Sequence, residues 1–182
     1  LYTKIGHFEM ANGGTLFLDE VSNLSYELQA ALLRTVQERK VKRIGSTKEI
    51  DLDVRILVAT NENLGDAIQK GRFREDLFHR FNEFNITVPS LRERGKDIML
   101  FVEHFLKHAN SELNKSVTDL SNEVIKCLMT YNWPGNIREL KNVIRRATLL
   151  SEGNEIQLKA LPLEISTLAK ASAIKKAFGA AG

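Results

Sequence analysis

The sequence predicts an α/β unit with a parallel sheet, followed by a small all-helical unit. Residues 15–18 (TLFL) and 54–59 (VRILVA) form two short runs that are apolar almost without interruption. Such runs predict strands that are buried on both faces of a parallel sheet. A helical pattern of apolar residues lies between them, which gives the strand, helix, strand order of an α/β fold. Beyond Pro89 the apolar residues recur only at helical spacing.

The helix between the two strands is predicted over roughly residues 25–38. Its apolar stripe consists of Leu24, Leu28, Ala31, Leu32 and Val36. Ser25 stands where an N-cap is expected, and Glu27 follows in the first turn. Residues 42–47, which contain Gly45, predict an exposed turn before the second strand. A third extended segment is predicted over residues 84–88, ended by Pro89.

Three helices are predicted in the second half of the chain. Their apolar stripes are Ile98, Phe101, Val102, Phe105 and Leu106; Val124, Ile125 and Leu128; and Ile137, Leu140, Ile144 and Ala147. A charged run at residues 91–94 interrupts the apolar pattern before them. We therefore expect residues 1–91 to form the α/β unit and residues 92–165 the helical unit. Residues 166–182 are expected to be a tail or linker.

The composition is that of a soluble globular protein. Of the 182 residues, 43% are hydrophobic and 27% are charged, and no apolar run reaches the length of a membrane span. The formal charge of +3 is too small to indicate nucleic-acid binding by itself. Cys127 is the single cysteine, so it forms no internal disulfide, and we expect it to be buried. These features predict a cytoplasmic protein without a membrane partner.

Two neighbouring carboxylates, Asp19 and Glu20, follow the first predicted strand. Ligands of α/β sheets usually bind at this edge, where an aspartate can hold Mg²⁺ on nucleotide phosphates and a glutamate can deprotonate the attacking water. In the alternative interpretation the two acids cap the turn into the next helix. Thr60 and Asn61 end the second strand, and they share this edge if the two strands are neighbours. An amide there could position a water, although a polar turn is the commoner arrangement.

Residues 71–81 place arginines between aromatic residues. Phe73, Leu77 and Phe81 lie four residues apart and predict the buried stripe of a short helix. Arg74 and Arg80 are six residues apart, which is about 240° around a helix, so one helix face cannot present both to a phosphate. Either the helix breaks between them or only one acts directly on a phosphoryl group, for instance in a neighbouring subunit. In the alternative interpretation they pair with Glu75 and Asp76 in solvent.

The segment WPGNIREL at residues 133–140 predicts a turn and a helix start. Asn136 is the predicted N-cap, and Glu139 stands at the reciprocal position of a capping box. Arg138 falls in the first turn, where a cation opposes the helix dipole. A bound phosphate or a neighbouring acid would offset this repulsion.

Two further groups have simpler interpretations. His104 and His108 lie four residues apart, but no acidic partner completes a recognised zinc pattern. The basic residues Arg39, Lys40, Lys42, Arg43 and Lys48 could meet a polyanion, although a solvated loop is the commoner case.

Five segments occur in an order that resembles a known family. They are GGTLFLDE at 13–20, VRILVATN at 54–61, GRFREDLFHRFN at 71–82, VPSLRERGKDI at 88–98 and WPGNIREL at 133–140. Residues 5–165 resemble the central AAA+ domain of bacterial enhancer-binding proteins, the NtrC-like activators of sigma-54 RNA polymerase. The resemblance implies part of a P-loop NTPase sheet followed by a helical AAA+ lid.

The resemblance also implies roles for individual residues. Asp19 and Glu20 match the Walker B acids, with Asp19 the Mg²⁺ ligand, and Asn61 matches the sensor I position. Arg74 and Arg80 match arginine fingers that act in trans, and Arg138 matches the sensor II arginine at the nucleotide.

At the level of the whole protein, the resemblance implies a ring oligomer, a hexamer, that uses ATP and Mg²⁺. The ring remodels the closed complex of sigma-54 RNA polymerase, and DNA is bound only by a domain outside these residues. The 182 residues contain neither a GxxxxGK[ST] phosphate loop nor a GAFTGA loop. We therefore expect this chain to be a fragment that does not bind ATP tightly on its own. The alternative is a stand-alone, non-catalytic AAA+-derived interaction or oligomerisation module.

Overall fold

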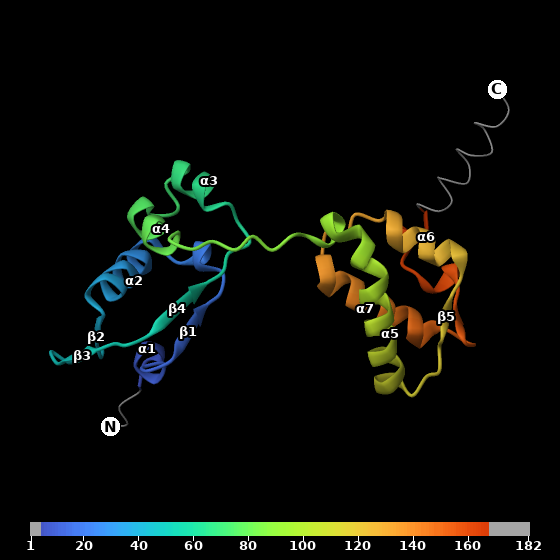
Figure 1. The fold of residues 1–182 in the computed structure, drawn as a ribbon, viewed down its shortest axis with the longest axis horizontal. Helices are drawn as coiled ribbons and strands as arrows, with labels where there is room; N and C mark the ends of the chain where they lie inside the picture. The colour runs from blue at the N-terminus through green and yellow to red at the C-terminus, as the bar shows by residue number, and fades with distance from the viewer. Residues whose placement is uncertain (1–4, 168–182) are drawn as a thin grey trace. The chain divides into compact units, whose positions relative to one another are not determined.

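The computed structural model describes residues 5–167. The chain divides into two compact units, residues 1–86 and 87–182 (Figure 1). The described part of each has its own hydrophobic core. The sequence-based boundary lies a few residues later, after residue 91. From residue 168 onward, the segment expected to be a tail lies outside the described residues.

The first unit is built on two parallel strands, β1 (Thr15–Leu18) and β4 (Arg55–Val58). They pair with Thr15 opposite Arg55 and Leu18 opposite Val58, and they lie side by side in Figure 1. The unit also contains α1 (His7–Met10), η1 (Val21–Asn23), α2 (Tyr26–Glu38), β2 (Lys40–Lys42), β3 (Glu49–Asp51), α3 (Leu64–Gln69) and α4 (Glu75–Phe81). The predicted strand, helix, strand order is confirmed.

Helices α2, α3 and α4 form the core of the first unit with the inner residues of the strands. Its buried residues are Val21, Leu32, Leu33, Ala67, Phe73 and Leu77, with Leu18 and Val58 packed against them. The expectation that both strand faces are buried is wrong within residues 5–167, because Phe17 is 58% and Leu57 is 44% exposed. Side chains alternate across a strand, so these two point away from the face on which the core packs.

Helix α2 begins as predicted, but its buried stripe is shifted. The Ser25 Oγ accepts a hydrogen bond from the Leu28 N–H at 3.3 Å, which confirms the N-cap. The buried residues of the helix are Gln29, Leu32 and Leu33, whereas Leu28, expected in the stripe, is 56% exposed. The stripe therefore contains a glutamine that the apolar pattern did not include.

The basic loop forms a small hairpin. Strands β2 and β3 pair in antiparallel fashion around the predicted turn, where Gly45 has a φ of +79°. The side chain of Arg43 donates to Glu9, and Lys40 and Lys42 pair with Glu49. Internal ion pairs thus occupy much of the basic cluster, which favours the solvated-loop interpretation.

The extended segment predicted at residues 84–88 is not a strand. Phe84, Ile86 and Val88 are 82%, 72% and 79% exposed, and no strand within the described residues pairs with them. An isolated extended segment has no ladder of hydrogen bonds, so its apolar residues alone do not make it a strand.

The second unit is a bundle around helices α5 (Ile98–Leu113) and α7 (Asn136–Leu150), which cross each other in Figure 1. It also contains η2 (Leu91–Asp97), β5 (Asp119–Leu120), α6 (Asn122–Thr130), β6 (Glu155–Ile156) and η3 (Leu158–Ala160). The three predicted helices are confirmed. The short parallel pair of β5 and β6 was not predicted, because two residues are too few to show a periodicity.

The core of the second unit is larger than that of the first. It includes Leu91, Val102, Leu128, Trp133, Leu140 and Ile144, all at most 3% exposed. Cys127 is completely buried among them, as expected. Among residues 5–167, no helix is long and apolar enough to cross a membrane.

Candidate functional site

The carboxyl ends of β1 and β4 form one polar edge in the first unit. The Ala59 N–H donates to the Leu18 carbonyl at 2.9 Å, and the Val21 N–H donates to the Ala59 carbonyl at 3.1 Å. These two bonds extend the parallel pairing past the ends of the strands. As a result, the Asp19–Glu20 and Thr60–Asn61 pairs leave the sheet at the same edge, as expected for neighbouring strands.

The two acids at this edge are exposed, and their backbone is unusual. Glu20 has a φ of 51°, in the left-handed region that non-glycine residues rarely adopt. The Asp19 Oδ1 accepts from the Glu20 N–H at 3.0 Å, and the Glu20 Oε2 accepts from the Asn23 side chain at 3.0 Å. Neither carboxylate caps α2, because Ser25 does so. The capping interpretation of the two acids therefore does not hold for that helix.

The chemistry of this edge fits Mg²⁺ bound together with a phosphate. Asp19, Glu20 and Asn61 are all exposed, and they offer carboxylate and amide oxygens. Mg²⁺ prefers oxygen ligands, and in nucleotide sites it takes only one or two carboxylates besides waters and phosphate oxygens. Within residues 5–167, no group of three or more His, Cys, Asp or Glu residues could hold a metal ion alone. Asp19, Glu20 and Asn61 are thus the residues of this edge whose oxygen atoms could hold a metal.

The two arginines lie near opposite ends of α4. Arg74 is the N-cap residue, just before the helix begins, and Arg80 is in the last turn. The expected break between them is not found, because α4 runs without interruption from Glu75 to Phe81 and Arg74 precedes it in extended conformation. The predicted helical stripe is confirmed only in part: Phe73 and Leu77 are buried and Phe81 is half-buried against the same core, but Phe73 precedes the helix.

Both arginines form ion pairs at the surface. The Arg74 guanidinium donates to both carboxylate oxygens of Asp76, at 3.0 and 2.7 Å, and lies 5.1 Å from the centre of the Tyr26 ring. The hydrogen bond from Arg74 lowers the pKa of Asp76 and raises the pKa of Arg74 itself. Arg80 donates to Glu83 at 3.3 Å. The pairing expected for solvated arginines is present for Arg74 with Asp76, while Glu75 lies near His79 instead.

A buried glutamine, which the sequence analysis did not single out, holds the backbone before α4. Gln29 is completely buried, and its Nε2 donates to the carbonyls of Leu24 at 2.8 Å and Arg72 at 2.9 Å. Its Oε1 accepts from the Arg74 N–H at 2.9 Å. A polar residue in the otherwise apolar stripe of α2 is the signal that could have revealed it.

Arg138 belongs to the second unit, at the start of α7. The predicted N-cap is wrong: α7 begins at Asn136, and the N-cap is Gly135. Asn136 has a φ of 55° and its Oδ1 accepts from the N–H groups of Leu91 and Ile137, both at 3.0 Å, so its side chain joins two segments. Glu139 still reaches back, accepting from the Gly135 N–H at 2.8 Å.

The side chain of Arg138 is exposed, and no carboxylate within residues 5–167 pairs with it. The neighbouring acid that could offset its position at the helix start is therefore not found there. Glu139 is engaged instead with Gly135 and with the Tyr131 hydroxyl. The Tyr131 pKa is raised by burial and by this carboxylate.

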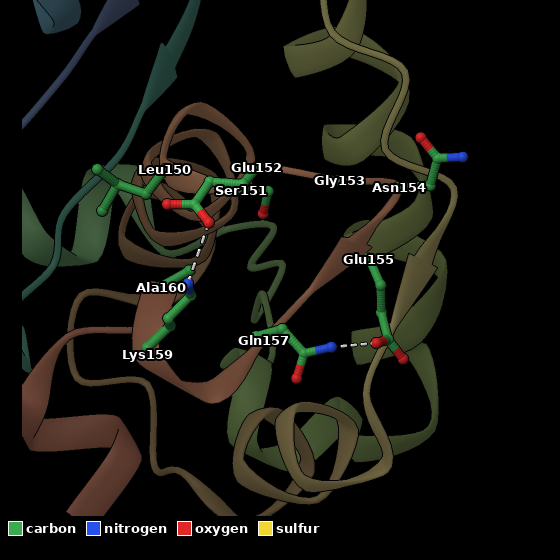
Figure 2. A pocket seen from close by; sticks show the side chains of 9 residues that line it. All are labelled: Leu150, Ser151, Glu152, Gly153, Asn154, Glu155, Gln157, Lys159 and Ala160. Carbon is green, nitrogen blue, oxygen red and sulfur yellow. Dashed lines mark hydrogen bonds and ion pairs between the residues drawn. The ribbon is translucent and has the colours of Figure 1, made fainter.

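The second unit also has a small pocket of about 250 Å³ at the C-terminal end of α7. Figure 2 shows its lining residues: Leu150, Ser151, Glu152, Gly153, Asn154, Glu155, Gln157, Lys159 and Ala160. Lys159 pairs with Glu152 at 3.4 Å, and Gln157 donates to Glu155, so its charged groups are largely satisfied. Arg138 is twelve residues away along α7, about 18 Å by helical rise.

The two histidines of α5 do not form a metal site with other residues. The rings of His104 and His108 lie 4.8 Å apart at the surface. In the part of the chain that the structure describes, no third ligand joins them.

Family comparisons agree with this division into a sheet unit and a helical unit. Residues 2–87 match the model of the Sigma-54 interaction domain, and residues 92–177 match that of the AAA+ ATPase lid domain.

Three similar curated proteins are one nitrogen fixation protein and two transcriptional regulatory proteins. Nitrogen fixation protein AnfA of Azotobacter vinelandii is 48% identical over 162 residues, which cover 89% of this chain and 30% of AnfA. Transcriptional regulatory protein XylR of Pseudomonas putida is 49% identical over 152 residues, or 84% of this chain and 27% of XylR. Transcriptional regulatory protein ZraR of Salmonella typhimurium is 45% identical over 161 residues, or 88% of this chain and 36% of ZraR. The chain thus spans about a third of the length of these relatives.

Solved structures show the same fold. NtrX from Brucella abortus in complex with ATP matches with a TM-score of 0.85 and 34% identity, over 97% of this chain and 44% of that one. NtrX in complex with ADP matches with a TM-score of 0.84 and 36% identity, over 90% of this chain and 38% of that one. The two adjoining family matches, these relatives and this fold show that the chain belongs to the AAA+ sigma-54 interaction family of NtrC-like activators, with the AAA+ lid as its second unit.

Proposed function

We propose that this chain is the second half of the ATPase core of a longer, sigma-54-dependent transcription activator. The observation that carries the proposal is the parallel register of β1 and β4, which gathers Asp19, Glu20 and Asn61 at one exposed edge. This is the edge of an α/β sheet at which phosphate ligands bind. Bound Mg²⁺ would neutralise charge on the nucleotide phosphates.

Each residue of the edge has a distinct role in the proposal. Asp19 would hold Mg²⁺, Glu20 would accept a proton from the attacking water, and Asn61 would orient that water. The relative NtrX was solved with ATP and with ADP, which supports a nucleotide as the ligand. Arg138 of the second unit is the proposed sensor II arginine, and its exposed guanidinium, which has no carboxylate partner within the described residues, is available to bind a phosphate.

Arg74 and Arg80 would act on the nucleotide of a neighbouring subunit. Their present partners, Asp76 and Glu83, are surface acids, 47% and 73% exposed, and surface ion pairs exchange at small energetic cost. Arginines that act on the nucleotide of a neighbouring subunit require a ring oligomer. We propose that this ring is a hexamer and that it works in the cytoplasm. Its target is the closed complex of sigma-54 RNA polymerase, and DNA would be bound through a domain outside these residues.

The proposal is tested in the full-length gene product. Glu20→Gln should keep Mg-ATP binding and lower hydrolysis by about 10²- to 10⁴-fold, since it removes a positioned base. Asp19→Asn should weaken Mg-dependent binding as well. Glu27→Gln is the matched control, because Glu27 is an exposed acid in the first turn of α2, and it should leave both unchanged.

Open-complex formation by sigma-54 RNA polymerase is the second measurement. The full-length protein should support it only with ATP, and the Glu20→Gln variant should not support it. Normal hydrolysis by Glu20→Gln would refute the role of Glu20. A full-length protein that assembles but neither binds nor hydrolyses ATP would instead support the non-catalytic interaction module.

A further inference from the structure

We propose that Gln29 is a positioning residue that sets the location of Arg74, so that turnover depends on Gln29 through that arginine. This inference rests on the proposed trans role of Arg74. It concerns a residue that lies in the core and takes no direct part in the chemistry of the polar edge.

The Gln29 amide is fully used inside the protein. Both of its donated bonds end on backbone carbonyls, those of Leu24 and Arg72, and its oxygen accepts the Arg74 N–H at 2.9 Å. The backbone is therefore fixed on both sides of Phe73, which is itself 2% exposed. Removing the amide would leave one backbone donor and two backbone acceptors unpaired in a partly buried place, and the segment would shift to reach other partners.

The side chain of Arg74 is held in a different way from its backbone. Its guanidinium meets Asp76 and the Tyr26 ring at the surface, where Asp76 is 47% exposed. These contacts can be exchanged for a phosphate, whereas the bonds of Gln29 are made by a completely buried amide and are partly shielded from solvent. Gln29 thus fixes the point from which the guanidinium reaches out, and the surface contacts hold it until a phosphate takes their place.

The segment of residues 72–74 is also connected to the elements that follow the polar edge. Helix α2 follows Glu20 after the short η1, Leu24 and the N-cap Ser25, so Gln29 belongs to the first long helix after the acids. On the other side, Glu62, which follows Asn61 directly, pairs with Arg72. The backbone that presents Arg74 is therefore anchored at both strand ends of its own subunit.

A double-mutant cycle in the full-length protein tests the inference. Gln29→Met keeps the length of the side chain and its helix propensity while removing the amide. It should lower kcat for ATP by about 10²-fold, the effect of a misplacement of about 1 Å, and leave KM within about two-fold. Gln37→Met is the matched control, because Gln37 is an exposed residue of the same helix, and it should leave kcat unchanged.

The decisive comparison is made in the Arg74→Ala background. If Gln29 acts through Arg74, then adding Gln29→Met to Arg74→Ala should lower kcat no further. An equal fold-reduction in both backgrounds, or normal kcat for Gln29→Met, would overturn the positioning role. If Gln29→Met does not assemble, Gln29→Asn, which keeps the amide but shortens its reach, goes through the same cycle with the same expected non-additivity. Full turnover by Arg74→Ala alone would instead refute the proposed role of the arginine.

Discussion

Asn136→Ala should destabilise the second unit, because Asn136 combines a left-handed backbone with a bond between two segments. Its φ is 55°, and its Oδ1 accepts from the N–H of Leu91, a residue that is 1% exposed. Alanine in the left-handed region costs about 1 kcal/mol, and an unpaired buried N–H about 1–3 kcal/mol. The free energy of unfolding should therefore fall by about 2–4 kcal/mol.

Two further variants separate the two contributions. Asn136→Gly accepts the positive φ but loses the hydrogen bond, so it should cost about 1–3 kcal/mol. Asn136→Asp keeps an acceptor at the start of α7, where a negative charge is favourable, and should stay within about 0.5 kcal/mol of the wild type.

Urea unfolding followed by tryptophan fluorescence measures these changes. Trp133 is the single tryptophan of the chain, is 3% exposed and donates to the Leu128 carbonyl at 2.8 Å, so it reports on the second unit. If Asn136→Ala changed the free energy of unfolding by less than about 0.5 kcal/mol, the reasoning about this residue would be refuted.

Three further predictions concern the core, pH and nucleotide binding. Leu77→Ala should lower the stability of the first unit by about 2–5 kcal/mol in urea melts followed by circular dichroism, because Leu77 is fully buried; a loss below about 1 kcal/mol would contradict this. Hydrogen bonds from arginines lower the pKa values of Glu9, Glu62 and Asp76 from the ordinary values of these carboxyl groups. Their contribution to stability is fully present above the ordinary pKa values and should disappear as the pH falls through the lowered ones; urea midpoints that rise on acidification would contradict this. The 182-residue chain alone should show no micromolar Mg-ATP binding by calorimetry, because it lacks the GxxxxGK[ST] sequence.

The sequence predicts best those elements whose pattern is local. The runs at 15–18 and 54–59 are long enough to show strands, although not their exposed faces, and the spacing of Ile137, Leu140 and Ile144 shows a helix. The apolar segment at residues 84–88 is not a strand, because strand formation depends on a partner that lies elsewhere in the chain. The predicted buried face of α2 did not include Gln29, because the pattern counts only apolar residues and Gln29 is polar although it is buried.

The polar edge could be predicted, because its residues directly follow the two strands in the sequence. The hydrogen bonds of Gln29 and Asn136 that hold the arginine-bearing segments could not be predicted. The bonds from Gln29 to Arg72 and Arg74 join residues more than forty positions apart, and the bond from Asn136 to Leu91 does the same. Periodicity gives no information on such pairs. In each case a side-chain amide, that of Gln29 or that of Asn136, pairs with a backbone group that would otherwise have no partner. Only the folded structure shows which backbone groups need such a partner.

Mixed assemblies of two inactive full-length variants test the central claim most directly. The claim is that Glu20 of one subunit and Arg74 of its neighbour serve the same nucleotide. Mixing Glu20→Gln with Arg74→Ala subunits creates interfaces with an intact acid and an intact arginine, so ATPase activity should return well above that of either variant alone. Arginine fingers contribute about 10³- to 10⁵-fold to the rate, which makes this recovery measurable. Mixed rings that form normally and stay inactive would contradict the account.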